Sequence, residues 1–95
     1  MTDFTADLAA PVGVAALAYA QARRDADKAE NAHKDAHNAC FSVYSNATAS
    51  ERNTLACALR EARLDCILTN AVRVDALTAL GDTVYAAYAA FKDSR

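Results

Sequence analysis

The chain has 95 residues, a formal net charge of −2 and 54% hydrophobic residues, of which few are aromatic. Most of the apolar content is alanine, which favours helix strongly and buries little surface. Only two Gly and one Pro are present, too few for the many turns of a β-rich fold. The composition therefore predicts one all-α domain and argues against a β-rich fold.

The N-terminal segment carries Asp3 where a secretory signal would carry positive charges. No apolar run approaches the roughly 18 residues of a membrane span. The three cysteines lack the paired spacing of a disulfide framework and fit reduced thiols better. We therefore expect a cytoplasmic protein with no membrane partner.

A heptad pattern of small and apolar residues begins at Leu8 and predicts a first helix over about 11–45. Pro11 suits the first turn of such a helix, where its missing N–H costs nothing. The mostly alanine seam would let a second helix approach closely. Its two rows are Leu8, Ala15, Ala22, Ala29, Ala36 and Val43, and Val12, Tyr19, Ala26, His33, Cys40 and Ala47.

Residues 46–50 carry the signals of a tight turn. Asn46 suits a left-handed position at the end of the first helix, and Thr48 with Glu51 matches a capping box. So short a connection sends the next helix back antiparallel. The sequence therefore predicts a helical hairpin whose second helix spans about 49–92.

The apolar stripe of the second helix shifts sideways after Cys66. The shift fits one long curved helix or a break near 69–71 or 81–82 that gives three helices. No Pro or Gly marks the first of these sites, which favours the hairpin. The stripe comprises Leu55, Leu59, Ala62 and Cys66, then Ile67, Ala71, Val74, Leu77, Val84, Tyr88 and Phe91.

A second apolar row of this helix is left over after the first is used: Leu64, Leu68, Ala71 and Val72. A homodimer that forms a four-helix bundle would cover it. A different target protein is the alternative, and a three-helix fold would bury the row internally.

One face of the first helix carries Glu30, His33, His37 and Cys40, and the hairpin register places Cys57 opposite Cys40. A Zn²⁺ ion held by His33, His37, Cys40 and Cys57 is one interpretation. The other is that the cysteines are small buried hydrophobes, and the lack of CxxC or HExxH spacing favours it. A Cys40–Cys57 disulfide is a third interpretation.

Basic and acidic residues are interleaved along both helices, which leaves no basic stripe for nucleic acid. The sequence also lacks a glycine-rich phosphate loop and a nucleophile elbow, and it has no acid pair set in an apolar segment. We therefore expect neither a nucleic-acid-binding protein nor an enzyme.

Aromatic residues gather near both ends of the predicted hairpin, and aromatic side chains commonly anchor interfaces. With the leftover row they give a candidate partner-binding set: Leu64, Leu68, Val72, Tyr85, Tyr88, Phe41 and Tyr44. We therefore expect a non-catalytic inhibitor or adaptor that occupies a surface of another macromolecule. Small phage-encoded inhibitors of bacterial defence, anti-CRISPR proteins among them, are similar in general build, although no motif here carries that likeness. A small metal-binding or metal-sensing bundle is the alternative.

Overall fold

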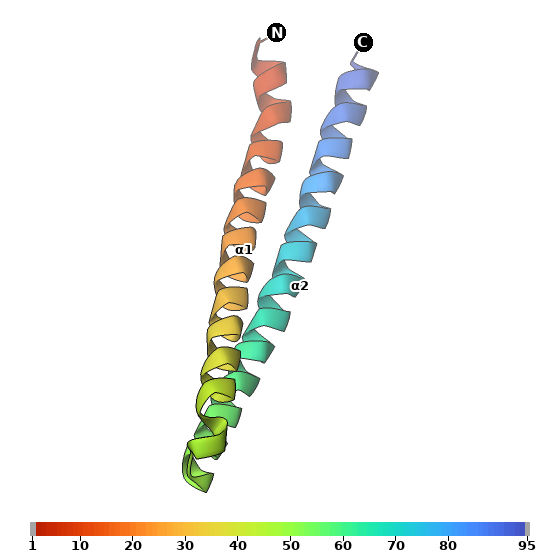
Figure 1. Ribbon diagram of the computed structural model, residues 1–95. Coiled ribbons are helices and arrows are strands. Elements are labelled where there is room, and N and C mark those ends of the chain that lie inside the picture. The colour runs from red at the N-terminus through yellow and green to blue at the C-terminus, as the bar shows by residue number, and fades with distance from the viewer. Residues whose placement is uncertain (1, 95) are drawn as a thin grey trace.

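The computed structural model describes residues 2–94, with side chains described at Asp7 and from Ala9 onwards. Two long helices, α1 (Thr2–Val43) and α2 (Ala49–Asp93), are joined by a short 3₁₀ turn, η1 (Tyr44–Asn46). They lie side by side as an antiparallel hairpin measuring 70 × 16 × 14 Å, with both termini at the end away from the turn (Figure 1). The predicted all-α hairpin is confirmed, and no strand occurs among the described residues.

The two predicted rows of α1 face α2. Ala22, Ala26 and Ala29 are buried. Most other members of the rows are half-buried: Val12, Ala15, Tyr19, His33, Ala36, Cys40 and Ala47. Val43 is the exception, with 46% of its surface exposed where α1 ends, and the side chain of Leu8 lies outside the described residues. The heptad pattern thus located the seam of α1 correctly.

The first helix begins at Thr2, about two and a half turns before the predicted start. Pro11 therefore lies inside α1, where it lacks the N–H that would bond the carbonyl of Asp7. The early start has a physical reason, because α2 extends far enough to pack beside this segment. Asp7 and Pro11 line one cleft with Thr83 and Ala86.

The turn is built differently from the prediction at Asn46. No described residue other than glycine has a positive φ, so Asn46 does not take a left-handed conformation. The 3₁₀ turn closes α1 instead, and Arg52 of α2 donates to the carbonyls of Tyr44 (Nε–O 3.0 Å) and Ser45 (Nη2–O 3.5 Å). An arginine from the next helix thus satisfies acceptors that the predicted left-handed residue would have satisfied locally.

Thr48 caps α2 as predicted. Its Oγ1 accepts a hydrogen bond from the backbone N–H of Glu51 at 3.2 Å. The same hydroxyl donates to Glu51 Oε1 at 3.0 Å. Thr48 and Glu51 together fix the start of α2.

Helix α2 continues without a break through 69–71 and 81–82. Its residues facing α1 keep one heptad spacing throughout: Arg52, Leu55, Leu59, Ala62, Cys66, Thr69, Arg73, Ala76, Leu80, Thr83 and Ala87. The predicted sideways shift of the seam after Cys66 is therefore wrong. Because α1 keeps a strict seven-residue repeat, α2 must stay in phase with it. This phase places Thr69 and Arg73 in the seam and leaves larger apolar residues outside.

Candidate interaction surface

The distribution of apolar residues is inverted relative to a globular domain. Among the described residues the only buried ones are three alanines, whereas a single-domain core is normally built from larger aliphatic and aromatic side chains. The large side chains lie outside: Val14, Leu17, Phe41, Val43, Tyr44, Leu64, Ile67, Leu68, Val72, Val74, Leu77, Val84, Tyr85, Tyr88 and Phe91. Exposed apolar surface on this scale is typical of interaction sites.

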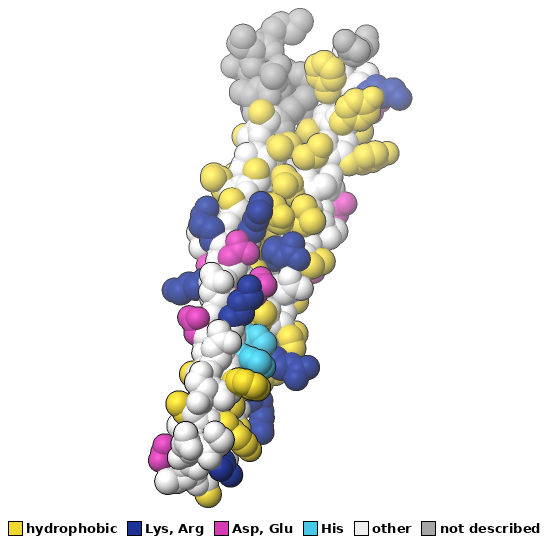
Figure 2. Space-filling model, viewed as in Figure 1, with side chains coloured by type: hydrophobic (Ala, Val, Ile, Leu, Met, Phe, Trp, Pro, Cys, Tyr) yellow, Lys and Arg dark blue, Asp and Glu magenta, His cyan; other side chains and the backbone are white. Residues whose placement is uncertain are grey.

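Five of these residues form an apolar stripe along α2: Ile67, Val74, Leu77, Val84 and Tyr88. Each lies one or four positions after Cys66, Arg73, Leu80 or Ala87 of the seam. This spacing places the stripe on one flank of α2, directly beside the seam. Figure 2 shows apolar side chains gathered on this face in the half of the hairpin nearer the termini.

Small residues of α1 lie on the same face of the hairpin. Gly13 and Ala16 follow Val12 by one and four positions, and Ala20 follows Tyr19 by one. Residues with the same offsets in the two helices share a cleft further along: Asp27 and Glu30 of α1 line it with Asn70 of α2. Gly13, Ala16 and Ala20 therefore lie beside the apolar stripe and leave its side chains standing above the surface.

A charged band crosses the middle of this face (Figure 2). Arg23, Asp27 and Glu30 line a cleft of about 460 Å³ with His33 and Arg73. The guanidinium of Arg73 donates to Asn70 Oδ1 from Nε at 3.1 Å and from Nη2 at 2.9 Å. Lys34 lies 3.9 Å from the carboxylate of Glu30. Both signs of charge are mixed within the band.

The turn end of the same face is aromatic. Phe41 is 83% exposed, the largest exposed fraction among the large apolar residues described. With His37, Tyr44 and Leu59 it lines an open cleft of about 470 Å³. Tyr44 has an internal role as well, because the guanidinium of Arg52 lies 5.0 Å from its ring centroid.

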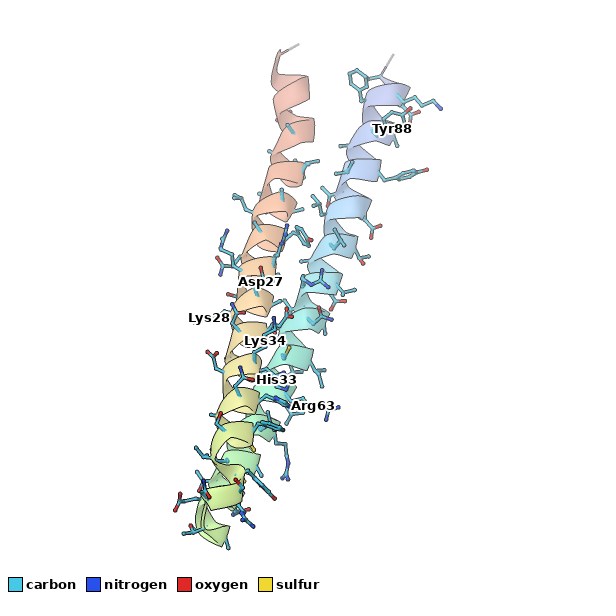
Figure 3. All side chains as sticks on the ribbon, in the orientation of Figure 1. Asp27, Lys28, His33, Lys34, Arg63 and Tyr88 are labelled. Atoms are coloured by element: carbon cyan, nitrogen blue, oxygen red, sulfur yellow. The ribbon has the colours of Figure 1, made fainter. Side chains whose placement is uncertain are left out.

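The predicted zinc ligands are only partly brought together. His33, His37 and Cys40 line one cleft with Arg60 and Arg63, as Figure 3 shows for His33 and Arg63. The described residues contain no group of three or more His, Cys, Asp or Glu side chains placed to hold a metal ion.

Cys57 explains why the predicted set fails. It lies two positions after the seam residue Leu55 and is exposed, facing away from α1. All three cysteines are free thiols, so the structure also has no Cys40–Cys57 disulfide. The predicted register correctly placed Cys57 at the level of Cys40 along the hairpin. The position of Cys57 around the axis of α2, however, directs its thiol away from α1.

The remaining predicted contact residues are exposed and lie outside the seam. Leu64, Leu68 and Val72 are exposed and form an outer row of α2, away from the apolar stripe. Tyr85 is exposed on the same outer side, whereas Tyr88 belongs to the stripe. Figure 3 shows Tyr88 on α2 near the C-terminal end.

Sequence reasoning assigned the apolar stripe to the seam, and of its residues it placed only Tyr88 in the candidate partner-binding set as well. The signal that could have found it is the heptad that begins at Arg52. Following that heptad requires accepting Thr69, Arg73 and Thr83 as seam residues. The larger apolar residues beside them then fall into a second row.

Neither helix, over the described residues, combines the length and apolar character that crossing a membrane requires. No family model, curated protein or solved structure matches this chain.

Proposed function

We propose that this chain is a non-catalytic helical interaction protein, an inhibitor or adaptor that works by occupying a surface of another protein. The observation that carries the proposal is the inverted apolar distribution, with alanines inside the hairpin and large side chains outside. Large exposed apolar side chains stabilise a complex when a partner covers them.

The outer row of Leu64, Leu68 and Val72 is the proposed contact for the partner. These three residues follow one another at spacings of four on α2, so their side chains form a continuous ridge along the helix. Such a ridge fits an apolar groove of a partner, as amphipathic helices do in helix-in-groove recognition.

The proposal includes a homodimeric four-helix bundle as the working form. The hairpin is 16 × 14 Å in cross-section, so α2 has one neighbouring helix only. Both the apolar stripe and the outer row of α2 remain uncovered. Helices in four-helix bundles each contact two neighbours. A dimer supplies the second neighbour and leaves the outer row for the partner protein.

Capture of partners from the native host tests the function. The unaltered chain is compared with Leu68→Glu and with Leu17→Glu, a matched control because Leu17 is a similarly exposed leucine on α1, away from α2. We expect Leu68→Glu to lose at least one captured protein, identified by mass spectrometry, that the unaltered chain and Leu17→Glu both retain. If the three captured sets are the same, the outer row is not the contact surface.

The metal-binding alternative gains no support from the geometry, because Cys57 faces away from the histidines. Metal analysis of untagged protein addresses it directly. Stoichiometric zinc that His37→Ala removes would favour that alternative over the interaction protein.

A further inference from the structure

We propose that a second copy of this chain covers the apolar stripe, packed face to face and parallel to the first. A two-fold axis runs along the length of the hairpin, so that α2 of each copy lies over α1 of the other and both turns lie at the same end. The inference rests on the proposed homodimer and defines its face and orientation.

The surface area of the single hairpin indicates a partner that covers a long face. Its accessible surface is 7189 Å², whereas a compact protein of 10.1 kDa exposes about 5,300 Å². The excess is roughly 1,900 Å², well above the ~800 Å² that each partner buries in a standard interface. An occupant of comparable length covers that much surface along the face, and a second hairpin has that length.

Side-chain sizes on this face are complementary between the two helices near the termini. Leu77 and Val84 of α2 are large, whereas Gly13, Ala16 and Ala20 occupy the matching levels of α1. The register follows from the cleft that Pro11 shares with Thr83 and Ala86. A lengthwise two-fold axis places each large side chain of α2 over a small residue of the other copy's α1.

At the turn end of the same face, the large side chain belongs to α1 and the small one to α2. Phe41 of α1 is large and exposed, and Ala56 of α2 is small. Both lie at the level of Cys40, because Cys40 lines one cleft with Phe41 and another with Ala56. The same axis therefore places Phe41 over Ala56 of the second copy, so side-chain sizes are complementary at both ends of the face.

The two glycines of the chain support close approach of a second backbone at this face. Gly13 and Gly81 lie inside helices, where glycine is less favourable than alanine. A Cβ atom built on either one would meet nothing within 4 Å, so packing within one chain does not require them. Both lie on this face at nearly the same level, and the lengthwise axis brings Gly81 of one copy over Gly13 of the other.

An axis across the hairpin gives a poorer fit. It would place α2 over α2 with opposite ends together, so that Leu77 and Val84 of one copy would lie near Arg63 and Arg60 of the other, apolar side chains against charged ones.

The first test measures mass and the face involved. Light scattering at tens of micromolar should give twice the chain mass for the unaltered protein and for Leu17→Glu, but the single-chain mass for Leu77→Glu. Circular dichroism shows whether Leu77→Glu remains helical. A monomeric unaltered chain, or a dimer that survives Leu77→Glu, overturns the proposal.

The second test measures orientation without weakening the interface. Two chains, each with all three natural cysteines changed to alanine, carry Ala20→Cys and Leu77→Cys respectively, and they are mixed and oxidised. We expect a disulfide between the different chains, since position 20 faces position 77 of the other copy. A link between two Leu77→Cys chains, or no link at all, overturns the parallel arrangement. The matched control replaces the first chain with Leu17→Cys, which should not link.

These results are independent of partner capture. A dimer of the expected orientation with no captured protein would reject the proposed function and retain the dimer. A monomer that captures a protein would reject the dimer and retain the proposed function.

Discussion

Single residues at the turn decide how the hairpin closes. Thr48 accepts from Glu51 and begins α2, while Arg52 reaches back to the last carbonyls before the turn. A planar guanidinium can bond a carbonyl from its edge and stack over a ring with its face, which an ammonium cannot do. The turn therefore depends on the kind of cation at position 52, and a positive charge alone would be insufficient.

Arg52→Lys is predicted to destabilise the protein by about 1 kcal/mol, through loss of one hydrogen bond and of the stacking on Tyr44. Urea unfolding followed by circular dichroism measures the change in the free energy of unfolding. Arg60→Lys is the control, since Arg60 is exposed and makes no hydrogen bond described here. Equal stabilities of the two variants would show that the Arg52 contacts contribute nothing.

Sequence reasoning located the seam correctly in α1 and wrongly in the part of α2 that follows Cys66. In α1 the seven-residue repeat is marked by alanines against a charged background, so its phase is unambiguous. In α2 large apolar residues occur in two adjacent rows. After Cys66 the row outside the seam is the more hydrophobic one, so hydrophobicity alone assigns the wrong row to the seam. Phase matching with α1 decides between them, and that is a property of the pair of helices.

Ala26→Leu is predicted to destabilise the hairpin by about 1–3 kcal/mol, because extra volume in a closely packed seam forces the helices apart. Ala26 is buried between the helices. Ala32→Leu is the control, since Ala32 is exposed on the same helix and leucine has nearly the helix propensity of alanine. Thermal unfolding of both variants should show a lower midpoint for Ala26→Leu only.

Pro11→Ala is predicted to stabilise the protein by about 1–3 kcal/mol, because it restores the backbone hydrogen bond to Asp7 and removes the clash of the ring with the preceding turn. The prediction depends on Pro11 lying inside α1. Chemical denaturation gives the free energy, and far-ultraviolet circular dichroism gives the helix content. An unchanged stability would place the start of the helix at Pro11, where the sequence alone predicted it.

At the scale of the whole molecule, the sequence predicts the shape of the hairpin better than it predicts which surface binds a partner. The hairpin and its register follow from the heptads and the turn signals. The position of the proposed partner surface does not follow from them, because an exposed row and a seam row can have the same composition in one helix. The radius of gyration is 21.0 Å, compared with about 12 Å for a compact chain of this length. So extended a chain has little core of its own, and its folding should be coupled to association.

The thermal midpoint of the unaltered chain is therefore predicted to rise with protein concentration. For a dimer that unfolds to two separate chains, each tenfold increase in concentration adds about 1.4 kcal/mol per dimer to the free energy that separates folded and unfolded states. Thermal scans by circular dichroism over a hundredfold range of concentration, at fixed buffer and salt, measure the effect. Leu77→Glu is the matched control and should show a low midpoint that does not change with concentration. A midpoint of the unaltered chain that is equally insensitive would mean that the three buried alanines and their half-buried neighbours hold the hairpin without a second copy.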